Sequence, residues 1–588
     1  MMVKKKNPGT PPVTLAASHS DRLFHEMKME AARALAMDPQ NVRALAQAIA
    51  STPAGSDPDD ELCDLLTMTL DQARMAQENG QRFGGECLDA VSRHLATLSG
   101  TPGLTLGGNI AITRCYVRAG LPVPEDLTPD DQALMEEAAT LSIDDDAHPE
   151  TAFAALLHDA LATVGDDPSM LHQAFAEILP GIPAAARRML CRLAAANPDR
   201  RLEPLACAWL LDPSESVRSG AIDGLGDRLA AGILSAQALS RLVVLRTWIV
   251  NKSARRRLDT LVRNAIRSGI SPDQAAVAPY RIVGYVSSPV DGAGAQSLGI
   301  ALQKGRARSI ALVLLKQQFG IKDAYIAPCA SAADQRSILQ QIAGPGQKGD
   351  ISPEYLQAVL GIALADGLHN GAYPAPGLVD VVDACAITAL RPEHDASIQA
   401  MLDRYDPEGD LASLDAKECE TLIAASADWA ALHPVIASWF EDRDDMFDGA
   451  ESSEAQAQAL WKHLETQRNF WASIIVRMAL LLKDRQDPLA PSFAVTARAL
   501  IHGRPLKEIP IMFTIFDQTF EARLMGHSTM DDEMPEEAAE ELMALMMNLM
   551  SPPKKTPKRS SRGTPPRKAP PRPGAATHLP APETLSAL

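Results

Sequence analysis

The last 38 residues carry the densest group of side chains that could bind a partner. Lys554, Lys555, Lys558 and Arg559 open a segment in which eight cations face Glu583 alone, a balance of +7. Cations on a flexible segment attract an acidic protein surface, nucleic acid or an anionic membrane, and salt weakens that attraction. The stretch RKAPPRP also has the spacing of Pro-rich ligands for aromatic grooves. The tail is therefore a contact for a partner, a contact for the chain's own acidic body, or a plain tether.

A second group of polar residues lies near the middle of the chain. Short β-favouring runs separated by Gly, Pro and Asp predict an antiparallel meander of three or four strands. Asp291, Gln296, Arg306 and Arg308 fall in its turns or at its strand ends, where binding residues tend to occur. We expect glutamate at both Arg306 and Arg308 to leave folding intact and to abolish a partner interaction. The alternative is a purely structural meander that caps or joins the helices, packing on them through the apolar residues Ile282, Tyr285, Leu298, Ile300, Leu302, Ile310, Leu312 and Leu314.

Motifs for catalysis are missing from the sequence. There is no Gly-Lys dipeptide for a phosphate-binding loop and no Gly-x-Ser-x-Gly for a nucleophile. No two of the 13 histidines are closer than six positions, whereas helical metal sites space them by three to five. Ser287 and Ser288 precede a Pro loop without a paired base. The sequence therefore predicts no catalytic residue, no cofactor and no metal.

Composition bounds the protein class. The chain has 588 residues with 46% hydrophobic, 22% charged and only 4% aromatic content, which favours closely packed helices in several domains or in one repeat array. The net charge of −18 with a +7 tail leaves −25 on the body. The eight cysteines are never closer than sixteen positions and read as buried reduced thiols. The longest apolar runs are interrupted by Arg246 and Arg477, so we expect a cytoplasmic protein without a membrane span.

Apolar periodicity of three and four predicts helices nearly everywhere outside the meander. The regions expected are a disordered leader (1–18), an N-terminal helical region (19–147), helical repeats (148–270), the meander (278–329), a C-terminal helical domain (330–550) and a disordered basic tail (551–588). Four tryptophans in the C-terminal domain, at 429, 439, 461 and 471, predict an aromatic core. The Met-rich helix that ends near residue 550 needs a cover, either the body or a partner.

One stretch carries a family resemblance. In LACAWLLDPSESVRSGAIDGLGDRLA, Asp212 and Pro213 are placed to cap and open a helix, and Val217, Ala221 and Leu225 lie on one face of it. Residues 202–230 thus resemble a HEAT-type repeat. The resemblance implies stacked helical hairpins, an α-solenoid, because one repeat cannot bury its apolar face alone.

Two weaker resemblances suggest other functions. Residues 31–47, with Asp38-Pro39 between two helical segments, resemble the end of a tetratricopeptide repeat. The pair His158-Asp159 resembles that of metal-dependent phosphohydrolases, with His148 and Asp166 as further ligands only by default. Generic helix punctuation is the better explanation of the first resemblance, and chance placement of a dipeptide on a helix surface is the better explanation of the second.

The interpretation that fits these observations is a mainly α-helical, HEAT-like solenoid with a small antiparallel β insertion and disordered termini. Its expected role is a non-enzymatic scaffold that binds another protein. The first alternative is a nucleic-acid-associated protein that uses the basic tail, and the second is a metal-dependent hydrolase with a dispersed site.

Overall fold

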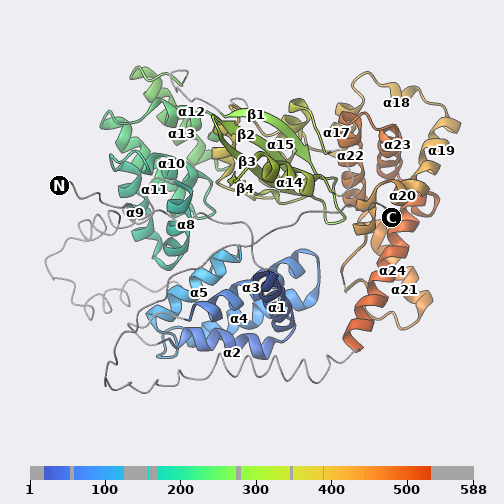
Figure 1. Cartoon of the computed structure of the whole chain (residues 1–588), viewed down its shortest axis with the longest axis horizontal. Coiled ribbons are helices and arrows are strands. Elements are labelled where there is room, and N and C mark those ends of the chain that lie inside the picture. The colour runs from blue at the N-terminus through green and yellow to red at the C-terminus, as the bar shows by residue number, and fades with distance from the viewer. Residues whose placement is uncertain are drawn as a thin grey trace, which may run out of the picture. The chain divides into compact units, whose positions relative to one another are not determined.

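The protein is mainly helical and contains one four-stranded antiparallel sheet, as a computed structural model shows (Figure 1). The structure describes residues 19–52, 59–124, 127, 157, 161, 168–272, 280–344, 349–387, 390–443 and 445–531. This confirms the coarse fold class. The predicted leader, the candidate metal ligands His148, His158, Asp159 and Asp166, the Met-rich helix and the basic tail lie outside the described residues. In the part of the chain that is described, no helix is both long enough and apolar enough to cross a membrane.

The first helices lie within the region 19–147 that the sequence predicts to be helical. They are α1 (His19–Ala36), α2 (Pro39–Ala50), α3 (Asp60–Glu78), α4 (Arg82–Leu98) and α5 (Leu106–Arg118). Asp38 caps α2 as expected, because its Oδ1 accepts a hydrogen bond of 2.9 Å from the backbone N–H of Gln40, and Pro39 occupies the first helical turn. Their buried residues, such as Val42 and Leu66, lie outside the continuous core that runs from Leu157 to Ile515.

The next helices form successive pairs. The first members are α8 (Pro168–Ile178), α10 (Leu202–Ala208) and α12 (Ala236–Leu245), and the second members are α9 (Ala184–Ala196), α11 (Glu215–Ala230) and α13 (Lys252–Arg267). First members contact first members, α8 with α10 and α10 with α12, and second members contact second members, α9 with α11 and α11 with α13. Val217, Ala221 and Leu225 are buried on one face of α11, as their spacing predicts.

Glycine brings α11 unusually close to α9. A Cβ atom on Gly224 would lie 2.4 Å from the carbonyl oxygen of Arg192, and one on Gly220 would lie 2.4 Å from that of Arg188. Both distances are too short for a real Cβ contact. The two helices therefore touch backbone to backbone, which only glycine allows at these positions.

The Asp212-Pro213 turn differs from its prediction. Asp212 Oδ1 accepts from the backbone N–H of Ser214 at 2.7 Å, and α11 begins at Glu215 with Ser214 at the N-cap. Pro213 therefore precedes the helix and does not open it. The Asp212 carboxylate stabilises a local turn through this hydrogen bond, and the helix therefore starts two residues after Pro213.

Asp212 makes stability pH-dependent in an unusual direction. Burial raises the pKa of its carboxyl to about 6, from 3.8 for the unperturbed group. The folded state thus holds a proton that the unfolded state has released between about pH 4 and 6, so this group's contribution to stability falls as pH rises through that window. Asp212→Asn should raise the free energy of unfolding by up to about 3 kcal/mol above pH 7 and change little near pH 4.

Urea unfolding at pH 4 and pH 8 measures this difference. Asp199→Asn is the control of opposite sign, because hydrogen bonding by Arg201 lowers the pKa of Asp199 and the wild-type carboxylate there stabilises the folded state above its pKa. Equal effects of Asp212→Asn at both pH values would contradict the prediction.

The meander is confirmed in all four strands. They are β1 (Arg281–Ser287), β2 (Ala295–Lys304), β3 (Ala307–Lys316) and β4 (Gly320–Cys329), paired antiparallel in the order β1-β2-β3-β4. The sheet has helices on both faces. A Cβ on Gly299 would lie 2.7 Å from Ile342 of α14 (Ala332–Ala343), whereas Gln296, of opposite parity in β2, bonds Tyr355 of α15 (Pro353–His369).

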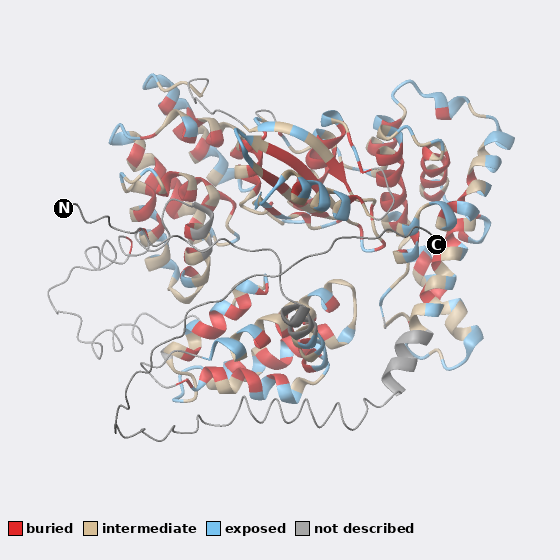
Figure 2. Cartoon of the chain, viewed as in Figure 1, coloured by how far each residue is buried: buried red, intermediate tan, exposed pale blue. Residues whose placement is uncertain are grey.

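One detail of the predicted apolar face is wrong. Leu302 pairs with Ser309 in the β2-β3 register, so the odd positions of β3 share a face with the even positions of β2. Ile310, Leu312 and Leu314 therefore lie on the α14 side, away from Leu298 and Ile300. The two-residue turn at Gly305-Arg306 fixes this register. Ala311, Val313 and Leu315 are buried and take the predicted places on the α15 side. Figure 2 shows in red that much of the sheet is buried.

The remaining helices follow the sheet, and the aromatic core lies among the later ones. They are α16 (Leu378–Ala384), α17 (Ile398–Tyr405), α18 (Asp410–Ser413), α19 (Ala416–Ala424), α20 (Trp429–Leu432), α21 (Ser453–Thr466), α22 (Arg468–Asp484), α23 (Ala490–Ile501) and α24 (Pro510–Asp531). The predicted tryptophan core is confirmed, since Trp429, Trp439 and Trp471 are fully buried. Trp429 stacks on Phe493 with ring centroids 3.5 Å apart. Trp461, which is only partly buried, stacks on Phe516.

Candidate functional site

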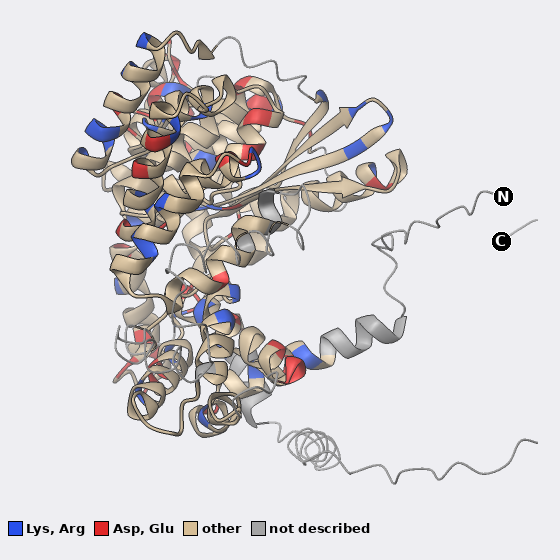
Figure 3. Ribbon diagram, turned by 90° about the vertical axis from the view of Figure 1, so that its left-hand side faces the viewer, with Lys and Arg blue, Asp and Glu red and all other residues tan. Residues whose placement is uncertain are grey.

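Helix α13 has a basic face without acidic partners. Lys252, Arg256, Arg263 and Arg267 follow one another at i, i+4, i+11 and i+15, so their side chains form a line along the helix. All four are exposed, while Leu258, Leu261, Val262 and Ala265 are buried on the other side. Within the described residues no carboxylate pairs with any of the four, which we call the α13 stripe. Blue residues in Figure 3 mark Lys and Arg.

Cations on the adjacent helices are, in contrast, paired. Arg188 on α9 bonds Asp223 on α11 at 2.8 Å, and Arg192 bonds Asp227 at 2.6 Å. Arg257, on the inner edge of α13, reaches the same Asp223. The hydrogen bonds that Arg192 donates to Asp227 also raise the pKa of Arg192. The exposed arginines of α9 thus find carboxylates on α11, whereas the α13 stripe has no carboxylate partner in the described part of the chain.

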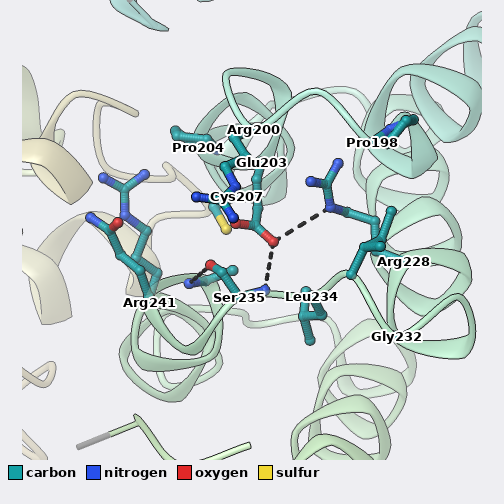
Figure 4. Close-up of a pocket in the computed structure, with 13 residues that line it drawn as sticks. Pro198, Arg200, Glu203, Pro204, Cys207, Arg228, Gly232, Leu234, Ser235 and Arg241 are labelled. Carbon is teal, nitrogen blue, oxygen red and sulfur yellow. Dashed lines mark hydrogen bonds and ion pairs between the residues drawn. The ribbon is translucent and has the colours of Figure 1, made fainter. Parts of the chain in front are cut away.

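A cavity of about 630 Å³ lies in the same region, between α10, the end of α11 and the start of α12 (Figure 4). Its walls hold the buried Arg228, the buried Glu203 and Arg241, which is 8% exposed. Arg228 Nε lies 3.4 Å from Glu203 Oε1, and that oxygen accepts a 2.9 Å hydrogen bond from the backbone N–H of Ser235. Arg200 stands exposed at the rim without a hydrogen bond or ion pair to the described residues.

Arg241 belongs to a separate network. Its guanidinium contacts Asp383 and lies 3.3 Å from Asp380, both on α16. Two carboxylates thus neutralise this cation from outside the cavity. Glu203 neutralises Arg228 in the same way, so Arg200 is the cation of this cavity whose side chain has no carboxylate partner among the described residues.

The polar residues proposed from the meander do not form one site. Gln296 is 3% exposed and donates to Ser287 Oγ and to the Tyr355 hydroxyl, each at 2.9 Å, so it is not a surface residue. Asp291 accepts from the backbone N–H of Ala293 and Ala295, and burial raises the pKa of Asp291. Both side chains hold the β1-β2 loop together.

The two arginines of that proposal have different surroundings. Arg306 is exposed at the β2-β3 turn, whereas Arg308 is half-buried and donates to Gln335 Oε1 at 3.1 Å. Lys554, Lys555, Lys558 and Arg559 lie outside the described residues. The hydroxyl of Ser287 donates to the carbonyl oxygen of Ser288. The hydroxyl of Ser288 donates to the carbonyl oxygen of Pro289, so both hydroxyls are hydrogen-bonded to the backbone.

A metal site has no support among the described residues, in which no three of the His, Cys, Asp and Glu side chains cluster as ligands. His148, His158, Asp159 and Asp166 lie outside them. The α13 stripe, in contrast, could have been found from the sequence KSARRRLDTLVRNAIR by following cations at helical spacing. The cavity could not, because its walls come from three separate elements.

Three segments of the chain match models of known domains. Residues 5–124 match the uncharacterised protein y4lR N-terminal domain, residues 183–269 the Y4lR second domain, and residues 399–524 the Y4lR C-terminal helical domain. The uncharacterised protein y4lR of Sinorhizobium fredii strain NGR234 is 28% identical over 481 residues, which cover 81% of this chain and 91% of y4lR. The chain is similar to y4lR along most of its length. No solved structure matches it.

The match to the Y4lR second domain contains both features described above. Residues 183–269 include the whole of α13 and every element that lines the cavity. The sheet lies between this match and the match to the Y4lR C-terminal helical domain.

Proposed function

We propose that the protein is a cytoplasmic, non-enzymatic scaffold whose residues 168–267 form a short HEAT-like α-solenoid. The first helices of its three pairs begin at Pro168, Leu202 and Ala236, so 34 residues separate successive starts. Equivalent helices contact each other along two rows, the arrangement by which helical repeats bury their apolar faces. All eight cysteines are free thiols, which suits a reducing compartment.

The α13 stripe is the docking edge of this scaffold for an acidic polypeptide. One observation carries the proposal: the exposed Arg188 and Arg192 pair with carboxylates of the next helix, whereas the four cations of the α13 stripe find no carboxylate among the residues that the structure describes. An acidic partner would supply the carboxylates that a further helix would have supplied.

A polypeptide fits this edge better than nucleic acid does. Ile266 and Val250 are 50% and 53% exposed beside the cations, and exposed aliphatic side chains pack on another protein rather than on phosphates. Arg192 on α9 donates two hydrogen bonds to the two carboxylate oxygens of Asp227 on α11, and the α13 arginines could bind carboxylates of an acidic polypeptide in the same way.

Charge reversal tests the proposed edge. The full-length protein should bind fluorescent poly-L-glutamate in an anisotropy titration, with affinity that falls between 50 and 300 mM salt. Arg256→Glu with Arg263→Glu should weaken that binding about tenfold or more, because two attractive contacts become repulsive. Arg336→Glu with Arg391→Glu is the matched control, since both residues are exposed and unpaired among the described side chains, and should stay within twofold.

Two rival sites are separated by the same titration. Loss of binding only when Arg306 and Arg308 become glutamate would move the edge to the β2-β3 turn. Loss only when Lys554, Lys555, Lys558 and Arg559 become alanine would move it to the tail. Tighter binding to duplex DNA than to poly-L-glutamate, lost in the α13 variant, would replace the acidic polypeptide with nucleic acid.

A further inference from the structure

We propose that Cys63 and Cys115 form a reversible redox pair, which a hydroperoxide converts into a disulfide between α3 and α5. The pair lies in the N-terminal helices and does not depend on the scaffold function or on the α13 stripe. The evidence is the contact between the two thiols, the partial exposure of Cys63 and the different surroundings of other cysteines in the chain.

Hydrogen bonds place the Cys115 sulfur beside Cys63. The Cys115 thiol, in the last turn of α5, donates to the carbonyl oxygen of Cys63 in the first turn of α3, with sulfur and oxygen 3.4 Å apart. The hydroxyl of Thr67, one turn further along α3, donates to the same carbonyl oxygen at 2.8 Å. The thiols of Cys63 and Cys115 also share a hydrogen bond. Two residues 52 positions apart in the chain thus bring their sulfurs together, as disulfide formation requires.

Cys63 is the thiol of the pair that a peroxide can reach. It is half-buried, whereas Cys115 is 1% exposed. The hydrogen bond from the Cys115 thiol lowers the pKa of Cys63, while burial and three nearby carboxylates act in the opposite direction. The same hydrogen bond, together with burial, raises the pKa of Cys115. Because the thiolate is the nucleophile, Cys63 reacts with the peroxide and Cys115 closes the disulfide.

Other cysteines have surroundings of a different kind. Burial raises the pKa of Cys87 to about 11 and that of Cys385 to about 12, which keeps both thiols protonated. Cys329 at the end of β4 is partly exposed, like Cys63, but burial raises its pKa and its charged neighbours are Asp334 and Arg308. Cys329 is therefore the matched comparison for Cys63 within the chain.

The reaction balances with one hydroperoxide for each pair. The Cys63 thiolate attacks the outer peroxide oxygen, so a sulfur-oxygen bond forms, the oxygen-oxygen bond breaks, and the leaving oxygen takes a proton from water. Cys63 is then a sulfenic acid. The Cys115 sulfur attacks the Cys63 sulfur, a disulfide bond forms, and the sulfenic oxygen leaves as water with the proton of Cys115. The two thiols lose two electrons in total, and the peroxide gains them.

Peptide mapping of the full-length protein tests the pair. The protein is treated with a small excess of hydrogen peroxide at neutral pH, its remaining thiols are alkylated, and its peptides are identified by mass spectrometry without reduction. We expect the Cys63 peptide linked to the Cys115 peptide, with two hydrogen atoms fewer than the free peptides, and separation of the two by dithiothreitol. Cys329→Ala is the control variant and should leave this link unchanged.

Cys115→Ala provides a second readout. Without the second thiol the reaction should stop at the sulfenic acid, so dimedone should label Cys63 about tenfold or more above the wild-type level. If this variant does not fold, the wild-type peptide map carries the test. No link between Cys63 and Cys115, or equal dimedone labelling of Cys63 and Cys329 in the variant, would overturn the proposal.

Thermal unfolding gives a third readout. A disulfide over 52 positions restricts the unfolded chain, so peroxide should raise the unfolding midpoint of the wild type, and dithiothreitol should return it to its starting value. A fall of the midpoint on oxidation would show that the helices must be distorted to close the bond, which would contradict a preformed pair.

Discussion

Gly224→Leu is expected to lower the free energy of unfolding of the helical-pair region by about 3 kcal/mol. The new Cβ would start 2.4 Å from the carbonyl oxygen of Arg192 and 2.5 Å from the Cβ of Ala195, so α11 must move away from α9. That movement also pulls Asp223 and Asp227 away from the arginines that they hold. Urea unfolding followed by circular dichroism measures the loss.

Gly226 is the matched control, two residues further along the same helix. A Cβ there meets nothing within 4 Å. Gly226→Ala should therefore raise stability by about 0.5–1 kcal/mol, because alanine restricts the unfolded chain and favours the helix. If Gly224→Leu and Gly226→Ala shifted the unfolding midpoint in the same direction, the close contact between α9 and α11 would not exist.

Gly224 also shows where sequence reasoning reached and where it stopped. The pattern of Val217, Ala221 and Leu225 predicts the buried face of α11 correctly, because a helix repeats its faces every three to four residues. The role of Gly220 and Gly224 depends on which helix lies opposite. The sequence alone does not show that this helix is α9, because α9 ends at Ala196 and α11 begins only at Glu215.

The sheet gives a similar division. Gly and Pro turns predicted a meander of three or four strands, because these residues favour the backbone angles of turns, and the structure has four. The side of β3 that faces α15 was assigned wrongly, since a shift of one residue at the Gly305-Arg306 turn exchanges both faces. Exposure of Gln296 was misjudged for a related reason. Its partners, Ser287 and Tyr355, come from β1 and α15, so its burial arises only after those elements assemble.

The two candidate sites differ in the same way. The α13 stripe is a property of one helix and is visible in its sequence. The cavity joins Arg200, Arg228 and Ser235, which belong to three elements, and its charge depends on the distances among them. Single helices can thus be interpreted before the structure is known, whereas sites between helices cannot.

Asp366→Leu is expected to destabilise the C-terminal half by about 3–5 kcal/mol. Asp366 Oδ2 accepts from Arg477 Nη2 at 2.8 Å, and Arg477 is 6% exposed in the middle of the apolar helix α22. The same oxygen accepts from the backbone N–H of Gln318 at 2.9 Å, in the turn between β3 and β4. Without the carboxylate, a buried guanidinium would be left with no counter-charge, which explains the large expected cost.

A double-mutant cycle distinguishes this cost from ordinary loss of packing. Arg477→Met alone removes the cation, and adding it to Asp366→Leu should recover most of the lost stability, because the buried charge is gone. The surface pair of Arg404 and Glu393, with side chains 42% and 32% exposed, is the control, and its cycle should give less than about 1 kcal/mol. Additive losses in the Asp366 and Arg477 cycle would contradict the prediction. Recovery in the double variant would mean that an apolar pair at these two positions holds the same fold. The ion pair of Arg477 and Asp366 would then add no net stability. Its role would be to select the position of α15 against α22.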